Sequence, residues 1–154
     1  MIIIKKAQLK DLEDIRKLNQ ALFNNDFVFD KTLDTSWPER NIKYYKENII
    51  SKDKVTFIAL LDNKIVGYLI ASIQKGESYR TLKRIAELEN MLVIEKFRCL
   101  GAGGLLVNEF FKWAKSMKVS RAKVVASAEN EKAISFYKKN HFVQHDITLE
   151  ADIA

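Results

Sequence analysis

The stretch Arg98-Cys99-Leu100-Gly101-Ala102-Gly103-Gly104 holds three of the five glycines in the chain. An apolar run, Met91-Leu92-Val93-Ile94, precedes it and is typical of a buried strand. After it, apolar residues recur with helical spacing at Leu106, Phe110, Trp113 and Met117. The order strand, glycine-rich loop, helix suits a polyphosphate. Residues without a β-carbon let backbone N–H groups approach phosphate oxygens, and a helix N-terminus favours negative charge. Arg98 adds a positive charge at the mouth of the loop.

Length and composition narrow the class of protein. A chain of 154 residues suits one domain, spanning residues 1–154. The formal net charge is +6, but the lysines are spread along the chain without a basic block, so we expect no nucleic-acid partner. The single cysteine excludes an internal disulfide and is typical of a reducing compartment. No run is apolar enough for a signal peptide or a membrane span, and we therefore expect a cytoplasmic protein with no membrane partner.

The rest of the chain predicts alternating strands and helices. Predicted strands cover Ile2–Lys6, Val55–Leu61, Lys64–Ile73, Ile85–Ile94, Lys123–Ala128 and Phe142–Glu150. Predicted helices carry the stripe Leu12, Ile15, Leu18 and Leu22, the segment from Trp37 to Ile49, the segment after the glycine loop, and Glu131–Lys139. Asp62-Asn63 indicates a hairpin turn, and Phe23–Trp37 an irregular connection. Asn130 is a helix cap, and Asn140 suits the left-handed residue at the other end. The pattern predicts an α/β (α+β) fold, a mixed sheet with helices on both faces.

In this order the elements resemble the GNAT superfamily of acyl-CoA-dependent N-acetyltransferases. Arg98-x-x-Gly101-x-Gly103 matches the family's Q/R-x-x-G-x-G/A pyrophosphate loop. A second signature, N-x-x-A-x-x-F-Y-x-x-x-G-F, is matched at Asn130, Ala133, Phe136, Tyr137 and Phe142. Two positions depart from the family: Cys99-Leu100 stands where a glycine is usual, and His141 replaces the last glycine, beside an asparagine that tolerates left-handed backbone. The resemblance implies a mostly antiparallel sheet whose strands splay at the cofactor site.

The resemblance also implies acetyl-CoA as the cofactor. Backbone N–H groups from Cys99 to Gly104, which include Leu100, Ala102 and Gly103, then hold the pyrophosphate. Met91-Leu92-Val93 supplies backbone groups to pantetheine, and an N–H near Leu92 polarises the thioester carbonyl. Asn130 caps its helix and contacts the cofactor as well.

Catalysis requires a neutral amine, because an alkyl ammonium has a pKa near 10.4 and is almost fully protonated at neutral pH. Glu87 and Glu89 lie two residues apart on one strand face, and a carboxylate there can take the proton. By resemblance Glu89 is the first choice of base and Glu87 the second. Both could instead bind a cationic acceptor or face solvent. Tyr137 matches the family tyrosine that contacts the cofactor and protonates the departing thiolate. Its alternative role is that of a core aromatic.

In the family's architecture the acceptor enters opposite the pyrophosphate. This places Phe27, Phe29, Asp30, Asp34 and Trp37 on the acceptor side, with Tyr79 facing them. Aromatic faces and carboxylates suit a cation, although the aromatic residues could equally fill a second core. The spaced pair His141 and His145 lacks a third ligand, so we expect no metal.

We therefore expect acetyl transfer from acetyl-CoA to a primary amine, in particular a small cationic amine, and a homodimer is possible. Protein or peptide N-acetylation and non-catalytic acyl-CoA sensing stay open as alternatives. Protein N-terminal acetylating members of the family often carry a glutamate where this chain has Val125, which favours the small amine.

Overall fold

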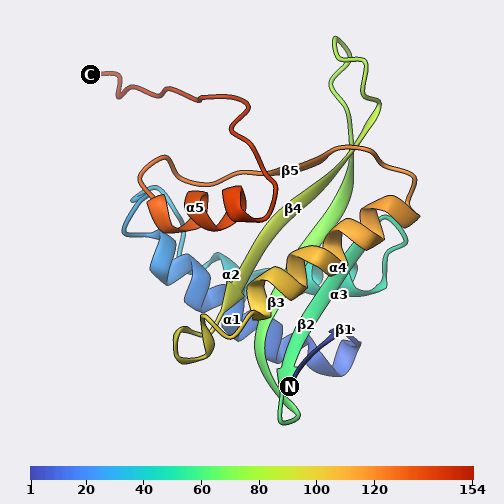
Figure 1. The fold of residues 1–154 in the computed structure, drawn as a ribbon. Helices are drawn as coiled ribbons and strands as arrows, with labels where there is room; N and C mark the ends of the chain where they lie inside the picture. Colours follow the sequence, from blue (N-terminus) through green and yellow to red (C-terminus); the bar gives the residue numbers. More distant parts are fainter.

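The computed structural model describes all 154 residues and contains one five-stranded sheet in the order β1-β2-β3-β4-β5 (Figure 1). The strands are β1 (Ile2–Lys6), β2 (Lys54–Leu61), β3 (Lys64–Lys75), β4 (Arg84–Val93) and β5 (Ala122–Val124). The first four are antiparallel, and β5 is parallel to β4. Helices α1 (Leu12–Asp26), α2 (Trp37–Arg40) and α3 (Ile42–Ile50) lie on one side of the sheet, and α4 (Ala102–Ser116) lies on the other. Helix α5 (Glu131–Lys139) lies near the β4–β5 edge, and short 3₁₀ turns cover Leu9–Asp11 and Glu95–Phe97.

The predicted fold class is confirmed, and each sheet face has its own core. On the α4 face, Leu106, Val107 and Phe110 are fully buried against β2, β3 and β4. On the opposite face, Ile15 of α1 and Tyr45 of α3 are buried against Tyr68 and its neighbours. No helix of the structure is long and apolar enough to cross a membrane.

The β2–β3 hairpin forms as predicted. Leu61 and Lys64 are register partners, so the loop contains only Asp62 and Asn63. Both loop residues have positive φ, 48° and 62°, which is the geometry of a type I′ turn. Asp and Asn tolerate this backbone region better than most residues do.

A β-bulge interrupts β4 at Glu89. Ile70 of β3 pairs with Asn90, whereas the next residue, Ala71, pairs with Leu88, which leaves Glu89 as the extra residue. Leu88 packs on the α4 face before the bulge, and Leu92 packs on the α1 and α3 face after it. A bulge re-aims side chains, and here it places the adjacent Glu89 and Asn90 side chains toward α3.

Several predicted element boundaries are corrected. The strand expected over Phe142–Glu150 is wrong, because residues 143–154 form no helix or strand and their backbone makes no hydrogen bonds. The alternation in that segment is that of a strand, but strands need a hydrogen-bonding neighbour. β5 also ends at Val124, well before the predicted Ala128. Helix α1 extends to Asp26 into the expected irregular segment, and a break at Asn41 separates α2 from α3.

The left-handed residue after α5 is His141, with φ 71°, and the expectation of Asn140 is wrong. The Phe142 N–H donates to the Tyr137 carbonyl and the His141 N–H to that of Lys138, the bonding pattern of a Schellman motif. The Asn140 amide instead donates to the Phe136 carbonyl. His141 therefore adopts the backbone conformation of the family's glycine, so the turn is preserved.

Candidate functional site

The glycine loop presents a row of unused backbone donors. The N–H groups of residues 99–104 donate to no acceptor within the protein, and no side chain caps α4. Cys99 and Gly101 have positive φ, 62° and 87°, which bends the loop around its own N–H groups. Consecutive N–H groups in such a turn, followed by a helix N-terminus, form a site for an anion. The residues fit a pyrophosphate.

Gly103 has a different role from the one the loop motif suggests. A β-carbon built there lies 2.9 Å from the Phe136 ring of α5 and 3.9 Å from the Met91 side chain. The missing side chain therefore lets α4 pack closely against α5. At Gly101 a β-carbon meets no atom within 4 Å, so the positive φ alone demands glycine there.

The outer edge of β4 is open beside this loop. β5 pairs only with Ala86–Leu88, so no strand lies next to β4 from Glu89 to Val93. The Ile94 N–H donates to Val66 of β3. Backbone groups alternate along a strand, so those of Leu92 also face β3, and those of Met91 and Val93 face outward. Arg98 closes the end of this edge, because its Nε donates to the Val93 carbonyl at 3.0 Å.

Tyr137 lies on α5 between Phe136 and Phe142, with ring centroids 5.3 Å and 5.6 Å away. Asn130 caps this helix as predicted, accepting from the Ala133 N–H. Burial, together with the charge of Asp26, raises the pKa of Tyr137 to about 12, so the phenol stays protonated at neutral pH. The Tyr137 hydroxyl makes no hydrogen bond within the protein. Among the fully buried side-chain polar atoms only Asn48 Oδ1 lacks a partner, so the Tyr137 hydroxyl is not fully buried and reaches solvent. A protonated, accessible phenol can donate a proton.

Glu87 and Glu89 have different surroundings. Glu87 Oε2 lies 3.7 Å from Lys123 Nζ of β5, where the two strands pair. Glu89 lies at the bulge, and both its oxygens accept hydrogen bonds: Oε2 from the Tyr44 hydroxyl at 2.5 Å and Oε1 from the Ser72 hydroxyl at 2.9 Å. The carboxylate of Glu89 is held in one orientation beside the open edge of β4, whereas that of Glu87 is held in an ion pair.

A network of side-chain hydrogen bonds continues from Glu89 into the core. Asn90 donates from Nδ2 to the Tyr44 hydroxyl and accepts from Tyr68, at 3.0 Å and 2.8 Å. Asn19 of α1 donates to Tyr68 at 2.8 Å and accepts from Tyr45 at 2.6 Å. Tyr45, Tyr68 and Asn19 are almost fully buried. Burial raises the pKa of Tyr44 and Tyr68 well above the ordinary value, so both remain hydrogen donors.

Sequence reasoning missed this network. Its tyrosines belong to a residue type that is common in cores, and Tyr44, Tyr68 and Ser72 come from separate parts of the chain. One signal was available: Asn19 lies four residues after Ile15 on the apolar stripe of α1, and a polar residue in such a stripe needs a buried partner.

The predicted acceptor residues are not gathered into one pocket. Trp37 stacks on Phe23 at 5.7 Å and contacts Tyr44 at 5.1 Å, so it fills the second core. Asp30 accepts from Thr32, and Asp34 accepts from Ser36 and pairs with Arg40; these hydrogen bonds lower the pKa of both carboxyls. Phe27 and Phe29 are exposed, with Lys31 over the Phe27 ring. Tyr79 lies on the exposed β3–β4 loop, which projects away from the helices (Figure 1).

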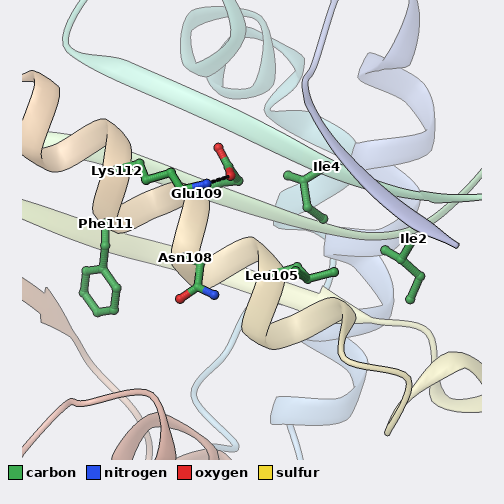
Figure 2. Close-up of a pocket in the computed structure, with 7 residues that line it drawn as sticks. All are labelled: Ile2, Ile4, Leu105, Asn108, Glu109, Phe111 and Lys112. Carbon is green, nitrogen blue, oxygen red and sulfur yellow. Dashed lines mark hydrogen bonds and ion pairs between the residues drawn. The ribbon is translucent and has the colours of Figure 1, made fainter.

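A separate hollow of about 460 Å³ lies between β1 and α4 (Figure 2). Ile2 and Ile4 face Leu105, and Lys112 pairs with Glu109 at 2.6 Å. The hollow lies at the β1 edge of the sheet, opposite the β5 edge, and none of the predicted site residues lines it. The structure holds no cluster of three metal-ligating side chains.

Comparison with known proteins agrees with the geometry. Residues 13–142 match the model of the acetyltransferase (GNAT) family. An N-alpha-acetyltransferase of Sulfurisphaera tokodaii is 24% identical over 144 residues, which cover 90% of this chain and 78% of that protein.

Solved structures share the fold. A variant of the BH1408 protein from Bacillus halodurans superposes with a TM-score of 0.88 at 17% identity, over 99% of each chain. The aminoglycoside N-acetyltransferase AAC(6')-Iy, bound to a bisubstrate analogue of coenzyme A and acetylneamine, gives a TM-score of 0.81 at 18% identity, over 100% of this chain and 99% of that one. With the free donors of the loop and the open edge of β4, the family match identifies the chain as a member of the GNAT acetyltransferases, which use acetyl-CoA.

Proposed function

We propose that the chain, as one catalytic domain over residues 1–154, transfers the acetyl group of acetyl-CoA to a small cationic primary amine. The observation that carries the proposal is the Glu89 carboxylate, fixed by two donors beside the open edge of β4. A fixed negative charge there attracts an ammonium group and can accept its proton. We also propose a cytoplasmic location, which the single cysteine supports.

Each residue has one task. Backbone N–H groups of residues 99–104 bind the pyrophosphate, and Arg98 adds charge at the loop. Acetyl-CoA supplies an activated thioester. Glu89 takes a proton from the ammonium group, and the lone pair of the neutral amine then forms the C–N bond with the thioester carbonyl carbon. The C–S bond breaks, and the nitrogen releases its second proton to solvent to become the amide. An outward N–H of Met91 or Val93 donates to the carbonyl oxygen as it gains charge. Tyr137 gives its phenolic proton to the sulfur leaving group and regains one from solvent.

Protein N-terminal amines are the second candidate acceptor. The supporting observation is that relatives from three archaeal species, each 24% identical, are N-alpha-acetyltransferases. Aminoglycoside N-acetyltransferases among the structural neighbours support the first candidate. Release of coenzyme A thiol should be measured with polyamines, amino acids, aminoglycosides and peptides with free N-termini. Turnover on the small amines supports the first candidate, turnover on peptides alone supports the second, and binding of acetyl-CoA without turnover indicates a sensor.

Tyr137→Phe tests the proton donor. The variant loses only the phenolic hydroxyl, which makes no hydrogen bond in the protein, so we expect a folded protein with roughly 10²–10⁴-fold lower kcat. Tyr45→Phe, which removes a hydroxyl from the opposite face of the sheet, is the matched control. Equal turnover of both variants and wild type would return Tyr137 to the role of a core aromatic.

Gly101→Val tests the pyrophosphate loop. Valine is strained at a φ of 87°, so the loop must re-aim its N–H groups, although no neighbouring atom obstructs the side chain. We expect the thermal stabilisation of the protein by acetyl-CoA to disappear, whereas Leu105→Val, a change at an exposed residue just outside the loop, keeps it. Unchanged stabilisation in Gly101→Val would show that the cofactor binds elsewhere.

We also propose that the chain is a homodimer. Its support is the exposed apolar surface of residues 143–154, which a monomer leaves in water.

A further inference from the structure

Helix α1 carries a stripe of residues that faces the sheet and ends in a carboxylate. Ile15, Asn19 and Leu22 follow one another with helical spacing, and all three pack or hydrogen-bond on the sheet face that α1 covers. Asp26 is the next residue at this spacing and the last residue of the helix. Positions two turns apart lie on nearly the same side of a helix, so Asp26 shares the sheet-facing side of α1 with Asn19.

Asp26 is half-buried and has no partner in the protein. Its carboxylate makes no side-chain hydrogen bond and no ion pair, so burial raises the pKa of Asp26 without any opposing contact. The residue also stands at the C-terminal end of α1, where the helix dipole disfavours a negative charge. A neutral side chain would suit both the burial and the helix better. The fold therefore does not explain this carboxylate.

The end of α1 lies close to the place where we propose acetyl transfer. In Figure 1 the last turn of α1 and helix α5 lie on the same side of β4. Burial, together with the charge of Asp26, raises the pKa of Tyr137 on α5 and of Tyr68 on β3. Tyr68 belongs to the hydrogen-bond network that ends on Glu89. Asp26 is thus a second carboxylate beside the reaction site, separate from the proposed base.

We propose that Asp26 binds a second ammonium group of the acceptor, and that the preferred acceptors are small molecules with two amino groups. The proposal rests on the acetyl transfer proposed above and deepens it. Glu89 acts on the amine that reacts, whereas Asp26 stays charged and holds the amine that does not. A cation that enters with the substrate gives the Asp26 carboxylate the partner that the protein itself does not supply. Such a charge-assisted hydrogen bond is stronger in a partly buried site than in water.

The test compares α,ω-diamines with monoamines of the same chain length in an assay of coenzyme A thiol release. Wild type should have a KM about 10–100-fold lower for the diamine, because one hydrogen bond between charged groups is added. In Asp26→Asn this preference should disappear, whereas kcat on the monoamines should stay near that of wild type. Asp30→Asn, on the exposed connection between α1 and α2, is the matched control and should keep the preference. Its amide oxygen can still accept from Thr32.

Thermal unfolding separates a binding role from a structural one. Asp26→Asn should be at least as stable as wild type, because it removes a half-buried charge from the unfavourable end of a helix. With coenzyme A bound, the diamine should raise the Tm of wild type more than that of the variant. A variant less stable than wild type would show that Asp26 serves the fold, and would overturn the proposal.

The kinetic outcomes keep the role of Asp26 apart from the proposed function. Equal KM values for diamines and monoamines in wild type would overturn the role of Asp26 and leave the acetyl transfer in place. A preference for diamines that survives in Asp26→Asn would overturn it as well. If neither kind of amine is turned over, the proposed function fails, and the role of Asp26 fails with it.

A second inference comes from the direction of the hydrogen bonds around Glu89. The Tyr44 hydroxyl accepts from Asn90 Nδ2, so its single hydrogen is free for Glu89 Oε2. The Ser72 hydroxyl accepts from Gln74 Nε2, so its hydrogen goes to Oε1. We infer that Tyr44 is a positioning residue, which aims the Glu89 carboxylate at the acceptor amine. A carboxylate has lone pairs left after accepting two hydrogen bonds, so one remains for the amine.

Tyr44→Phe tests this role, with Tyr45→Phe as its matched control on the same helix. Both variants lose one hydroxyl of the buried network, but the Tyr45 hydroxyl donates to Asn19, several hydrogen bonds away from Glu89. Both should lower the free energy of unfolding by a similar amount. Only Tyr44→Phe should also lower kcat, about tenfold, with KM for acetyl-CoA unchanged.

Glu89→Gln distinguishes the positioning role from the proposed base. If Glu89→Gln is impaired and Tyr44→Phe keeps the kcat of wild type, the positioning role is wrong and the base stands. If Glu89→Gln has the wild-type rate at every pH, the base is wrong and the role of Tyr44 fails with it.

Discussion

The two faces of the sheet are built on different principles. The α4 face buries only apolar side chains, such as Leu88, Leu106 and Phe110. The α1 and α3 face buries Asn19 and the hydroxyls of Tyr45 and Tyr68 in a connected network that ends on Glu89. Apolar packing needs only shape and volume, whereas every member of a buried polar network must be paired. The first face is suited to stability, and the second holds a carboxylate in a fixed place.

The largest effect on kcat should follow from the replacement of Glu89, at which the polar network ends. Glu89→Gln keeps the size of the side chain but cannot take a proton, so kcat at neutral pH should fall by roughly 10²–10⁴-fold. The loss should shrink at alkaline pH, where the amine is already neutral. A pH–rate profile on the best acceptor measures both effects.

Glu87→Gln is the matched control for this prediction, because Glu87 is engaged with Lys123. We expect its kcat to stay near that of wild type and any change to appear in KM. A collapse of kcat in Glu87→Gln with normal activity in Glu89→Gln would reverse the two roles.

The α4 face should respond in stability and not in chemistry. Leu106→Ala removes a fully buried side chain from the apolar core, so the free energy of unfolding should fall by about 2–5 kcal/mol. Urea unfolding measures the loss, and KM for acetyl-CoA should hardly change while the protein remains folded. A fall in kcat larger than the fraction unfolded would show that the two faces are coupled.

The sequence predicted the α4 face of the sheet better than the face covered by α1 and α3. The α4 face follows from the periodic stripe Leu106, Phe110 and Trp113, which predicts an amphipathic helix and is buried against the sheet. The other face depends on one extra residue in β4: without the bulge at Glu89, Leu88 and Leu92 would share a face. Alternation alone cannot locate such a residue, because the bulge depends on pairing with β3. The network therefore became visible only in the structure.

Residues 143–154 show a second limit of prediction from the sequence. Their alternation from Val143 to Ile153 is typical of a strand, but no strand forms, because pairing is a property of the surroundings and not of the segment. The glycine loop and the helix that follows it were, in contrast, predicted from the sequence. The requirement for Gly101 is local, because its φ is 87°. Local requirements were therefore predicted better than requirements set by another element.

A buried hydroxyl tests the cost of the polar face. Tyr68→Phe leaves Asn90 Oδ1 without its donor from Tyr68 and Asn19 Nδ2 without its acceptor on Tyr68. The loss of these two hydrogen bonds should lower the free energy of unfolding by about 1–3 kcal/mol. Urea unfolding again provides the measurement. Unchanged stability would mean that the remaining Asn19–Asn90 hydrogen bond, 3.2 Å long, compensates for the loss.

The smallest effect should appear in strongly alkaline solution. Burial raises the pKa of Tyr137 to about 12 in the folded protein, whereas an unfolded tyrosine titrates near 10. Between these values the folded state holds more protons than the unfolded state. The stability contributed by the neutral phenol is therefore complete below pH 10 and is lost as the pH rises toward 12. For Tyr137 alone the loss is on the order of 1 kcal/mol by pH 11. Urea unfolding at pH 9, 10 and 11 should show a decline that is shallower in Tyr137→Phe than in wild type. Parallel declines would mean that Tyr137 titrates normally and that the tyrosines of the opposite face, Tyr44, Tyr45 and Tyr68, account for the whole alkaline loss.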